Sequence, residues 1–220
     1  MARRIVVLVI SLLALSFSVL ADGGKLEATG PLADAAVSSA LKESLESKGH
    51  RVTLAGGQVL CEIWLKRSIQ PKAKDDVSGA IYTELGESTL IGVISFPKAT
   101  KDYRGQGIKP GAYTLRYALH PADGNHLGIS TYRDFLVMSP VASDADPEAR
   151  FKFDELVKLS AKTLGGNHPS PVSLVSAQGG ATLPAVYKDS NGHLVFEAKL
   201  KTQAGAELPI AFVVEGEAAQ

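Results

Sequence analysis

The sequence predicts a mainly β protein of the α+β type, an antiparallel β-sandwich of about nine strands with two amphipathic helices. Three observations lead to this class. Short segments of alternating polar and apolar residues follow one another closely, glycine- or proline-containing turns separate them, and only two segments have a helical period. Because no helix stands between successive strands, the pattern favours an antiparallel sandwich or barrel-like sheet over a parallel, doubly wound sheet.

The expected strands have a period of two and are bounded by turn residues. Gly56-Gly57 and Asn191-Gly192 each mark a hairpin between two of them. The ten candidate segments are residues 51–55, 58–66, 80–85, 88–96, 112–120, 134–139, 172–176, 183–188, 193–200 and 207–214.

Two segments have the spacing of amphipathic helices. In residues 32–48, Val37, Leu41 and Leu45 recur every four positions, and Gly49 follows as a stop signal. The second helix is expected over residues 147–164, with Gly165-Gly166 as its end. Residues 22–30, which are polar and contain glycine, are expected to be a flexible start of the chain.

The N-terminus has the three parts of a secretory signal peptide. Arg3 and Arg4 precede an apolar run over residues 5–20, and small residues then lead to a cleavage site after Ala21. The run is shorter than the roughly 20 apolar residues of a membrane-spanning helix, although an uncleaved anchor is the alternative. We therefore expect residues 1–21 to be a signal peptide, residues 22–220 to form a single β-rich domain, and the protein to be periplasmic or extracellular.

Charge and cysteine content exclude several classes of protein. The 23 Lys+Arg and 23 Asp+Glu residues balance, and removal of residues 1–21 leaves two more acidic than basic side chains. Such a chain is not a basic nucleic-acid binder, and no segment after the signal peptide is apolar enough for a stable membrane span. The single cysteine, Cys61, excludes a disulfide framework, and we expect it to be a buried small hydrophobic side chain. Trp64 is expected in the core, the alternative being an exposed platform for a sugar.

The segment Lys109-Pro-Gly-Ala-Tyr-Thr-Leu-Arg116 combines a Pro-Gly turn with an alternating aromatic and aliphatic strand. It resembles an edge found in secreted β-sandwich modules, including prealbumin-like domains. With the signal peptide and the Cys-Glu-Ile-Trp-Leu strand, the chain looks like uncharacterised secreted bacterial β-sandwich proteins of this size. This resemblance implies a fold and a location, and it implies no activity, cofactor or catalytic residue.

A polar stretch over residues 102–134 contains the candidate metal ligands. His120, Asp123 and His126 are three residues apart across a Pro-x-Asp-Gly turn, which brings its flanks together. Two histidines with a carboxylate from Asp123 or Asp134 suit a divalent metal such as zinc. The alternative is structural: Asp123 caps the turn, and Asp134 forms an ion pair with Arg104 or Arg116.

The sequence contains no nucleophile elbow, no phosphate-binding loop and no His-Glu-x-x-His motif. The first expectation is therefore a non-enzymatic module without a cofactor, which binds a ligand, a surface polymer or an envelope protein. Its binding surface is expected on the loop 98–109 and the turn 121–133, with Tyr103, Arg104 and Arg133 as ligand contacts. The alternative is a metal-binding protein or metal-dependent hydrolase; a third hypothesis is a structural envelope component whose helices pack on a partner.

Overall fold

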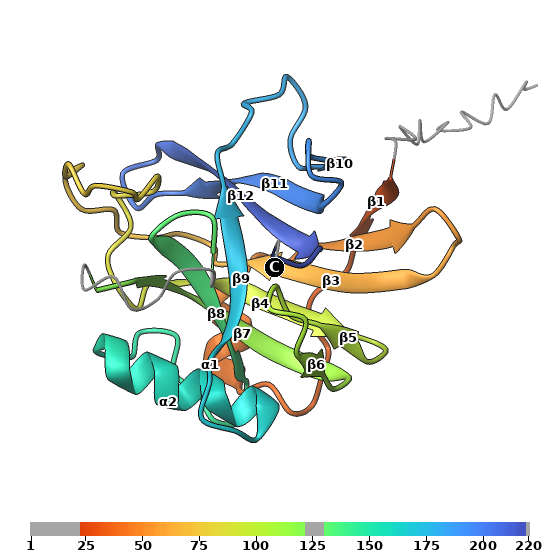
Figure 1. Cartoon of the computed structure of the whole chain (residues 1–220), viewed down its shortest axis with the longest axis horizontal. Coiled ribbons are helices and arrows are strands. Elements are labelled where there is room, and N and C mark those ends of the chain that lie inside the picture. The colour runs from red at the N-terminus through yellow and green to blue at the C-terminus, as the bar shows by residue number, and fades with distance from the viewer. Residues whose placement is uncertain (1–22, 122–129, 219–220) are drawn as a thin grey trace, which may run out of the picture.

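A computed structural model of the protein describes residues 23–121 and 130–218 (Figure 1). Over these residues the protein is mainly β, with two helices. Ten of the described strands form one antiparallel sheet in the order β1-β2-β3-β4-β7-β8-β9-β12-β11-β10, and β5 and β6 form a separate ribbon. The sheet is nearly closed and barrel-like, rather than a clear sandwich of nine strands as predicted. The expected signal peptide, residues 1–21, lies outside the described residues.

The strands of the large sheet are β1 (Gly24–Thr29), β2 (Gly49–Leu54), β3 (Val59–Leu65), β4 (Leu90–Phe96), β7 (Gly111–Leu119), β8 (Asp134–Pro140), β9 (Ser170–Val175), β10 (Ala185–Lys188), β11 (Leu194–Lys201) and β12 (Glu207–Glu215). The ribbon consists of β5 (Thr100–Lys101) and β6 (Gly107–Ile108), and the helices are α1 (Ser39–Ser44) and α2 (Phe153–Leu164). Nine of the ten predicted strand segments contain a strand, so the alternating pattern was a sound guide to the sheet.

The sheet bends at β9, which belongs to two groups of strands. Residues 170–173 pair with β8, whereas Leu174 and Val175 pair with β12. Figure 1 shows β9 running between the group that contains β7 and β8 and the group that contains β11 and β12. The inner faces of the two groups close on one core, in which Phe196 and Phe212 are buried together with Leu115. This shared strand joins the two groups into one sheet.

The two ends of the strand order, β1 and β10, approach each other without pairing. They meet where β1 begins, because a Cβ atom on Gly23 would lie 2.7 Å from Cγ of Lys188. Gly24 similarly faces the side chain of Leu194, at 3.5 Å from an added Cβ atom. We call this line between β1 and β10 the seam of the sheet.

The helices cover the outer face of the sheet. Leu156 of α2 packs on Phe135 and Val137 of β8. Leu41 of α1 belongs to a second cluster with Trp64, whose indole Nε1 donates a hydrogen bond to the carbonyl of Gly30 at 2.9 Å. The prediction that Trp64 lies in the core is confirmed, since it is 3% exposed.

The predictions for residues 22–48 are partly wrong. The flexible start expected over residues 22–30 is wrong for the described residues, because β1 (Gly24–Thr29) pairs along its whole length with β2. The helix expected over residues 32–48 is only α1, although Val37, Leu41 and Leu45 are all buried as expected. The helix ends early because the backbone at Leu45 leaves the helical conformation and forms a bridge to Lys66 beyond β3. Pairing with the sheet thus overrides the helical period.

The strand expected over residues 80–85 is absent from the described sheet. The backbone N–H groups of Ile81 and Tyr82 donate instead to the carboxylate of Asp134, at 3.1 and 2.7 Å. The Tyr82 hydroxyl donates to Val175 and accepts from the N–H of Ala211. A side chain therefore satisfies the backbone donors that a neighbouring strand would otherwise satisfy.

The second helix starts at Phe153, not at residue 147, because the preceding loop is held by a buried ion pair. Arg116 on β7 donates from Nε and Nη2 to both oxygens of Asp144, at 2.6 and 2.8 Å, and both side chains are 0% exposed. Its remaining hydrogen bonds go to the carbonyls of Ser88, Asp146 and Ala149. One guanidinium group thus anchors residues 144–149 to the sheet and prevents them from joining α2.

Asp144→Asn should lower the free energy of unfolding by about 3–5 kcal/mol, because it leaves the buried Arg116 cation without a counter-charge. Urea unfolding of the two proteins measures the difference. Asp146→Asn is the matched control: it removes an exposed carboxylate from the same loop and should change stability by less than about 0.5 kcal/mol. Equal destabilisation by the two variants would contradict this role for the ion pair.

The prediction that Cys61 is a buried small hydrophobic side chain is confirmed. It is 0% exposed in the main core, where burial, reinforced by the charges of Glu62 and Glu215, raises the pKa of the thiol far above its usual range. Because the thiolate is the reactive form, we expect no labelling of the folded protein by a thiol reagent and rapid labelling in denaturant. Rapid labelling under native conditions would show that the core opens around Cys61.

Candidate functional site

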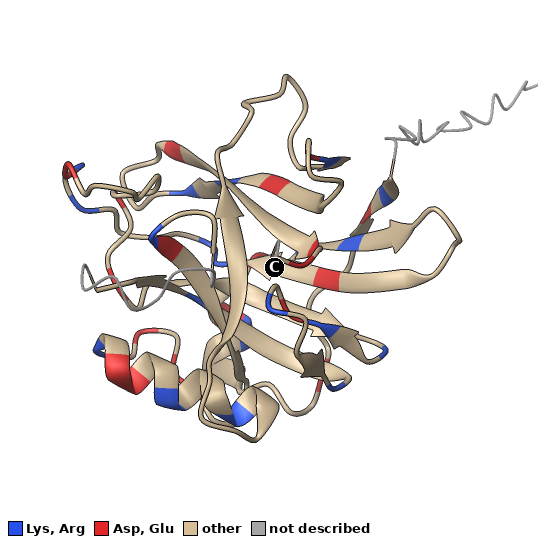
Figure 2. Cartoon of the chain, in the orientation of Figure 1, with Lys and Arg blue, Asp and Glu red and all other residues tan. Residues whose placement is uncertain are grey.

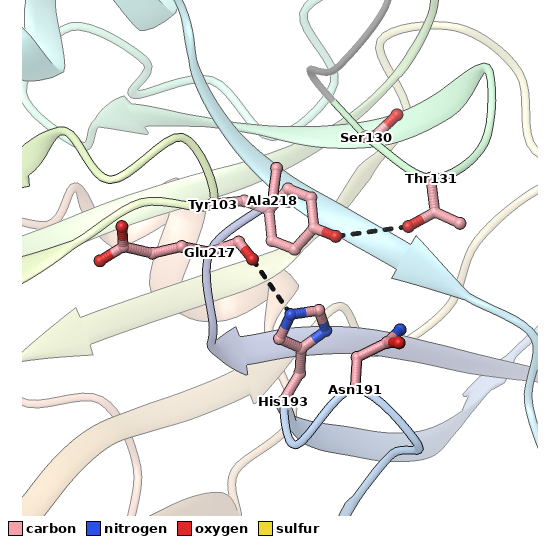
Figure 3. A pocket seen from close by; sticks show the side chains of 7 residues that line it. All are labelled: Tyr103, Ser130, Thr131, Asn191, His193, Glu217 and Ala218. Carbon is pink, nitrogen blue, oxygen red and sulfur yellow. Dashed lines mark hydrogen bonds between the residues drawn. The ribbon is translucent and has the colours of Figure 1, made fainter. Parts of the chain in front are cut away.

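The candidate site is a pocket of about 480 Å³ formed by four segments that are far apart in the sequence. We call it the Tyr103–His193 pocket. Its lining residues are Tyr103, Ser130, Thr131, Asn191, His193, Glu217 and Ala218 (Figure 3). They come from the β5–β6 turn, the residues before β8, the β10–β11 turn and the tail after β12.

Tyr103 is held in place by the rigid turn between β5 and β6. The buried carboxylate of Asp102 accepts hydrogen bonds from the N–H groups of Arg104 and Gln106, at 3.0 and 2.9 Å, and from the Ser170 hydroxyl at 3.1 Å. Burial raises the pKa of Asp102, and these hydrogen bonds oppose the shift. The Asp102 carboxylate thus holds the backbone of the turn that carries Tyr103.

His193 joins two walls of the pocket. Its Nδ1 lies 3.1 Å from Oδ2 of Asp189 in the β10–β11 turn, and its Nε2 lies 3.1 Å from the backbone oxygen of Glu217 in the tail. The ring also meets Tyr103 edge to face, with 5.6 Å between the centroids. Gly216 permits the tail to approach the His193 ring this closely, because an added Cβ atom on Gly216 would lie 2.4 Å from Cδ2 of His193. The φ of Gly216 is +154°, a conformation that favours glycine.

The lining of the pocket combines polar and apolar surface and is mostly uncharged. The Tyr103 hydroxyl lies 3.4 Å from Oγ1 of Thr131. Asn191 is an exposed residue of the β10–β11 turn. The Glu217 carboxylate turns away from the His193 ring (Figure 3) and pairs with Lys101 at 2.7 Å. The lining therefore offers the rings of Tyr103 and His193, hydroxyl groups and an amide, which suits a neutral polar ligand.

The predicted ligand contacts Tyr103, Arg104 and Arg133 do not come together. Tyr103 lines the pocket, whereas Arg104 is exposed beside it and does not line it. The Arg133 guanidinium donates to the carbonyl of His120, at 2.7 Å from Nη2, and to the carbonyl of Ser78 at 3.1 Å. Arg133 thus fixes the backbone of two neighbouring segments.

The predicted metal ligands His120 and Asp134 lie on opposite faces of the sheet. His120 stacks on Phe135 at 4.2 Å, on the outer face beneath α2, whereas Asp134 faces the Tyr117 hydroxyl on the core side. The expected ion pair of Asp134 with Arg104 or Arg116 is wrong, since Asp134 accepts backbone N–H groups and Arg116 pairs with Asp144. Burial raises the pKa of Asp134.

Asp123 and His126 lie outside the described residues. Within residues 23–121 and 130–218, no group of three or more His, Cys, Asp or Glu side chains is arranged to hold a metal ion.

Sequence reasoning did not find His193, Asn191 or Glu217. The Asn191-Gly192 turn was recognised, and Gly192 has the expected positive φ of 80°. The missing information was that this turn lies against Tyr103, about 90 residues earlier in the chain, because β12 and β11 continue the sheet beyond β9. A local sequence pattern cannot predict a contact between residues that are about 90 positions apart.

Comparison with known proteins adds no relative: no protein-family model, no curated protein and no solved structure matches this chain. Among the residues that the structure describes, no helix is both long enough and apolar enough to cross a membrane.

His193→Ala should loosen the C-terminal tail, because it removes the imidazole ring that bridges the Asp189 carboxylate and the Glu217 carbonyl. We expect exchange of the Ala218 amide, which bonds the Tyr103 carbonyl at 2.8 Å, to rise about fivefold, as for a loss of roughly 1 kcal/mol. Hydrogen exchange followed by NMR measures this rate. His168→Ala, at an exposed loop position, is the control and should leave the rate unchanged; an unchanged rate in His193→Ala would refute the link.

Proposed function

We propose that the protein is a non-enzymatic binding module of the cell envelope, which binds a neutral, polyhydroxylated ligand such as a sugar unit of a surface polymer in the Tyr103–His193 pocket. The observation that carries the proposal is the composition of this pocket. The lining contains the Tyr103 ring, the Thr131 hydroxyl and the Asn191 amide, and its one carboxylate, that of Glu217, pairs with Lys101. Sugars present both apolar C–H faces and hydroxyl groups, and this lining complements both.

The hydrogen bonds of His193 favour binding over catalysis. A general base needs a ring nitrogen within reach of the proton that it abstracts. Both ring nitrogens of His193 face oxygen atoms of the protein, those of the Asp189 carboxylate and the Glu217 carbonyl, so neither points to open space in the pocket. We therefore assign His193 a positioning role, in which it holds the pocket walls together.

The proposed location outside the cytoplasm is supported by the sequence of residues 1–21, with Arg3 and Arg4 before an apolar run. The buried Cys61 is compatible with an oxidising compartment, because a thiol without access to solvent is not readily oxidised. A surface polymer would be available to a binding module in that location.

The test is an NMR titration of isotope-labelled protein (residues 22–220) with neutral saccharides: glucose, galactose, N-acetylglucosamine and maltose. At least one should bind with about millimolar affinity and shift the amide signals of Tyr103, Thr131, Asn191 and His193. Asn191→Ala should weaken this binding about two- to tenfold, the range expected for one hydrogen bond.

Asn167→Ala is the matched control, since Asn167 is an exposed asparagine of a turn distant in sequence from the lining. It should leave the affinity unchanged. Binding that shifts signals only outside the lining, or no binding of any of the four sugars, would overturn the proposed ligand class.

A further inference from the structure

A second hollow, separate from the Tyr103–His193 pocket, gathers basic side chains from three parts of the chain. It has a volume of about 210 Å³ and is lined by Glu46, Ser47, Lys48, Arg67 and Lys201. Figure 2 shows that basic and acidic residues are otherwise interspersed over the sheet and α2. A local concentration of three cations therefore stands out in a chain whose formal net charge is zero.

The backbone fixes the segments that carry these cations. The N–H of Arg67 donates to the carbonyl of Ser44 at 2.8 Å, and the N–H of Glu46 donates to the carbonyl of Leu65 at 2.9 Å. The N–H of Ile69 donates to the carbonyl of Lys201, also at 2.9 Å. The backbone positions of Arg67 and Lys201 are thus fixed by these hydrogen bonds, and Lys48 lies between Glu46 and the start of β2 at Gly49.

Charge in the hollow is only partly compensated. Glu46 Oε1 accepts from Lys201 Nζ at 2.8 Å, and this hydrogen bond together with the charge of Glu46 raises the pKa of the Lys201 ammonium. Arg67 donates from Nη2 to the carbonyl of Leu45 at 3.3 Å. Within residues 23–121 and 130–218, neither Lys48 nor Arg67 forms an ion pair, so two positive charges of the hollow have no acidic partner.

We propose that this hollow is a binding site for a phosphate-class oxyanion, with Lys48, Arg67 and Lys201 as its cationic contacts. The planar guanidinium of Arg67 suits two oxygens of a tetrahedral anion, and the two ammonium groups act as point charges. The Ser47 hydroxyl supplies a further donor. The volume admits a single anionic group, so a free phosphate or the phosphate group of a larger molecule satisfies the same site.

The site is independent of the proposed saccharide pocket. The two linings share no residue, and the hollow lies beside the end of β11, whereas His193 precedes the start of that strand. A ligand can thus be bound at either site alone, and failure of one proposal leaves the other in place.

The experiment is an NMR titration with inorganic phosphate at constant ionic strength, which sodium chloride maintains. We expect saturable shifts of the Ser47, Lys48 and Arg67 amide signals. The variant Lys48→Gln/Arg67→Gln should weaken binding about tenfold, since it removes two charge-assisted hydrogen-bond donors. Lys158→Gln/Lys162→Gln on α2 lowers the net charge equally at two exposed positions and should bind as the unchanged protein does.

Further titrations with sulfate and acetate define the class of anion. Sulfate should bind at the same residues, and acetate should bind at least about threefold more weakly because it carries one charge and two oxygens. Non-saturable shifts with phosphate, or equal weakening in both double variants, would overturn the site. Unfolding midpoints of the variants, expected to match that of the unchanged protein, establish that lost binding does not reflect lost structure.

Discussion

The buried ion pair between Arg116 and Asp144 is the contact on which the outer face of the fold depends. It fixes the loop between β8 and α2 to the middle of β7, and so determines where α2 can start and which face of the sheet it covers. Removing two charges from water has a large free-energy cost, which only a complete set of hydrogen bonds offsets. The guanidinium meets that condition through Asp144 and three backbone carbonyls.

The same solution, a buried charged group that satisfies backbone donors or acceptors, recurs where the chain is irregular. Asp134 binds the N–H groups of residues 81 and 82, Asp102 binds those of the β5–β6 turn, and Glu197 accepts from the N–H groups of Gln178 and Gly179. Each carboxylate replaces a missing strand neighbour. Of the segments that line the Tyr103–His193 pocket, the β5–β6 turn is held in this way, by Asp102.

Much of the sheet could be predicted because alternation of apolar residues is a local property of each strand. Errors arose where distant groups override local preference: Leu45 leaves a helical pattern to pair with the sheet, and Tyr82 leaves a strand-like pattern to bond Asp134. The residues of the candidate site could be predicted only in part. Tyr103 was predicted from its polar loop, whereas His193 depends on the order of strands β9, β12 and β11, which no segment of sequence encodes alone.

The seam between β1 and β10 leaves two strand edges whose backbone groups are not paired within the sheet. Such edges are templates on which a second chain can add a strand and begin a fibre. Here β1 carries Lys25 and Glu27, linked at 2.9 Å, and β10 is only 4 residues long, ending at Lys188 against Gly23. Charge on one edge and shortness of the other oppose growth of a cross-β assembly, so an incompletely closed sheet remains compatible with a monomeric chain at high concentration.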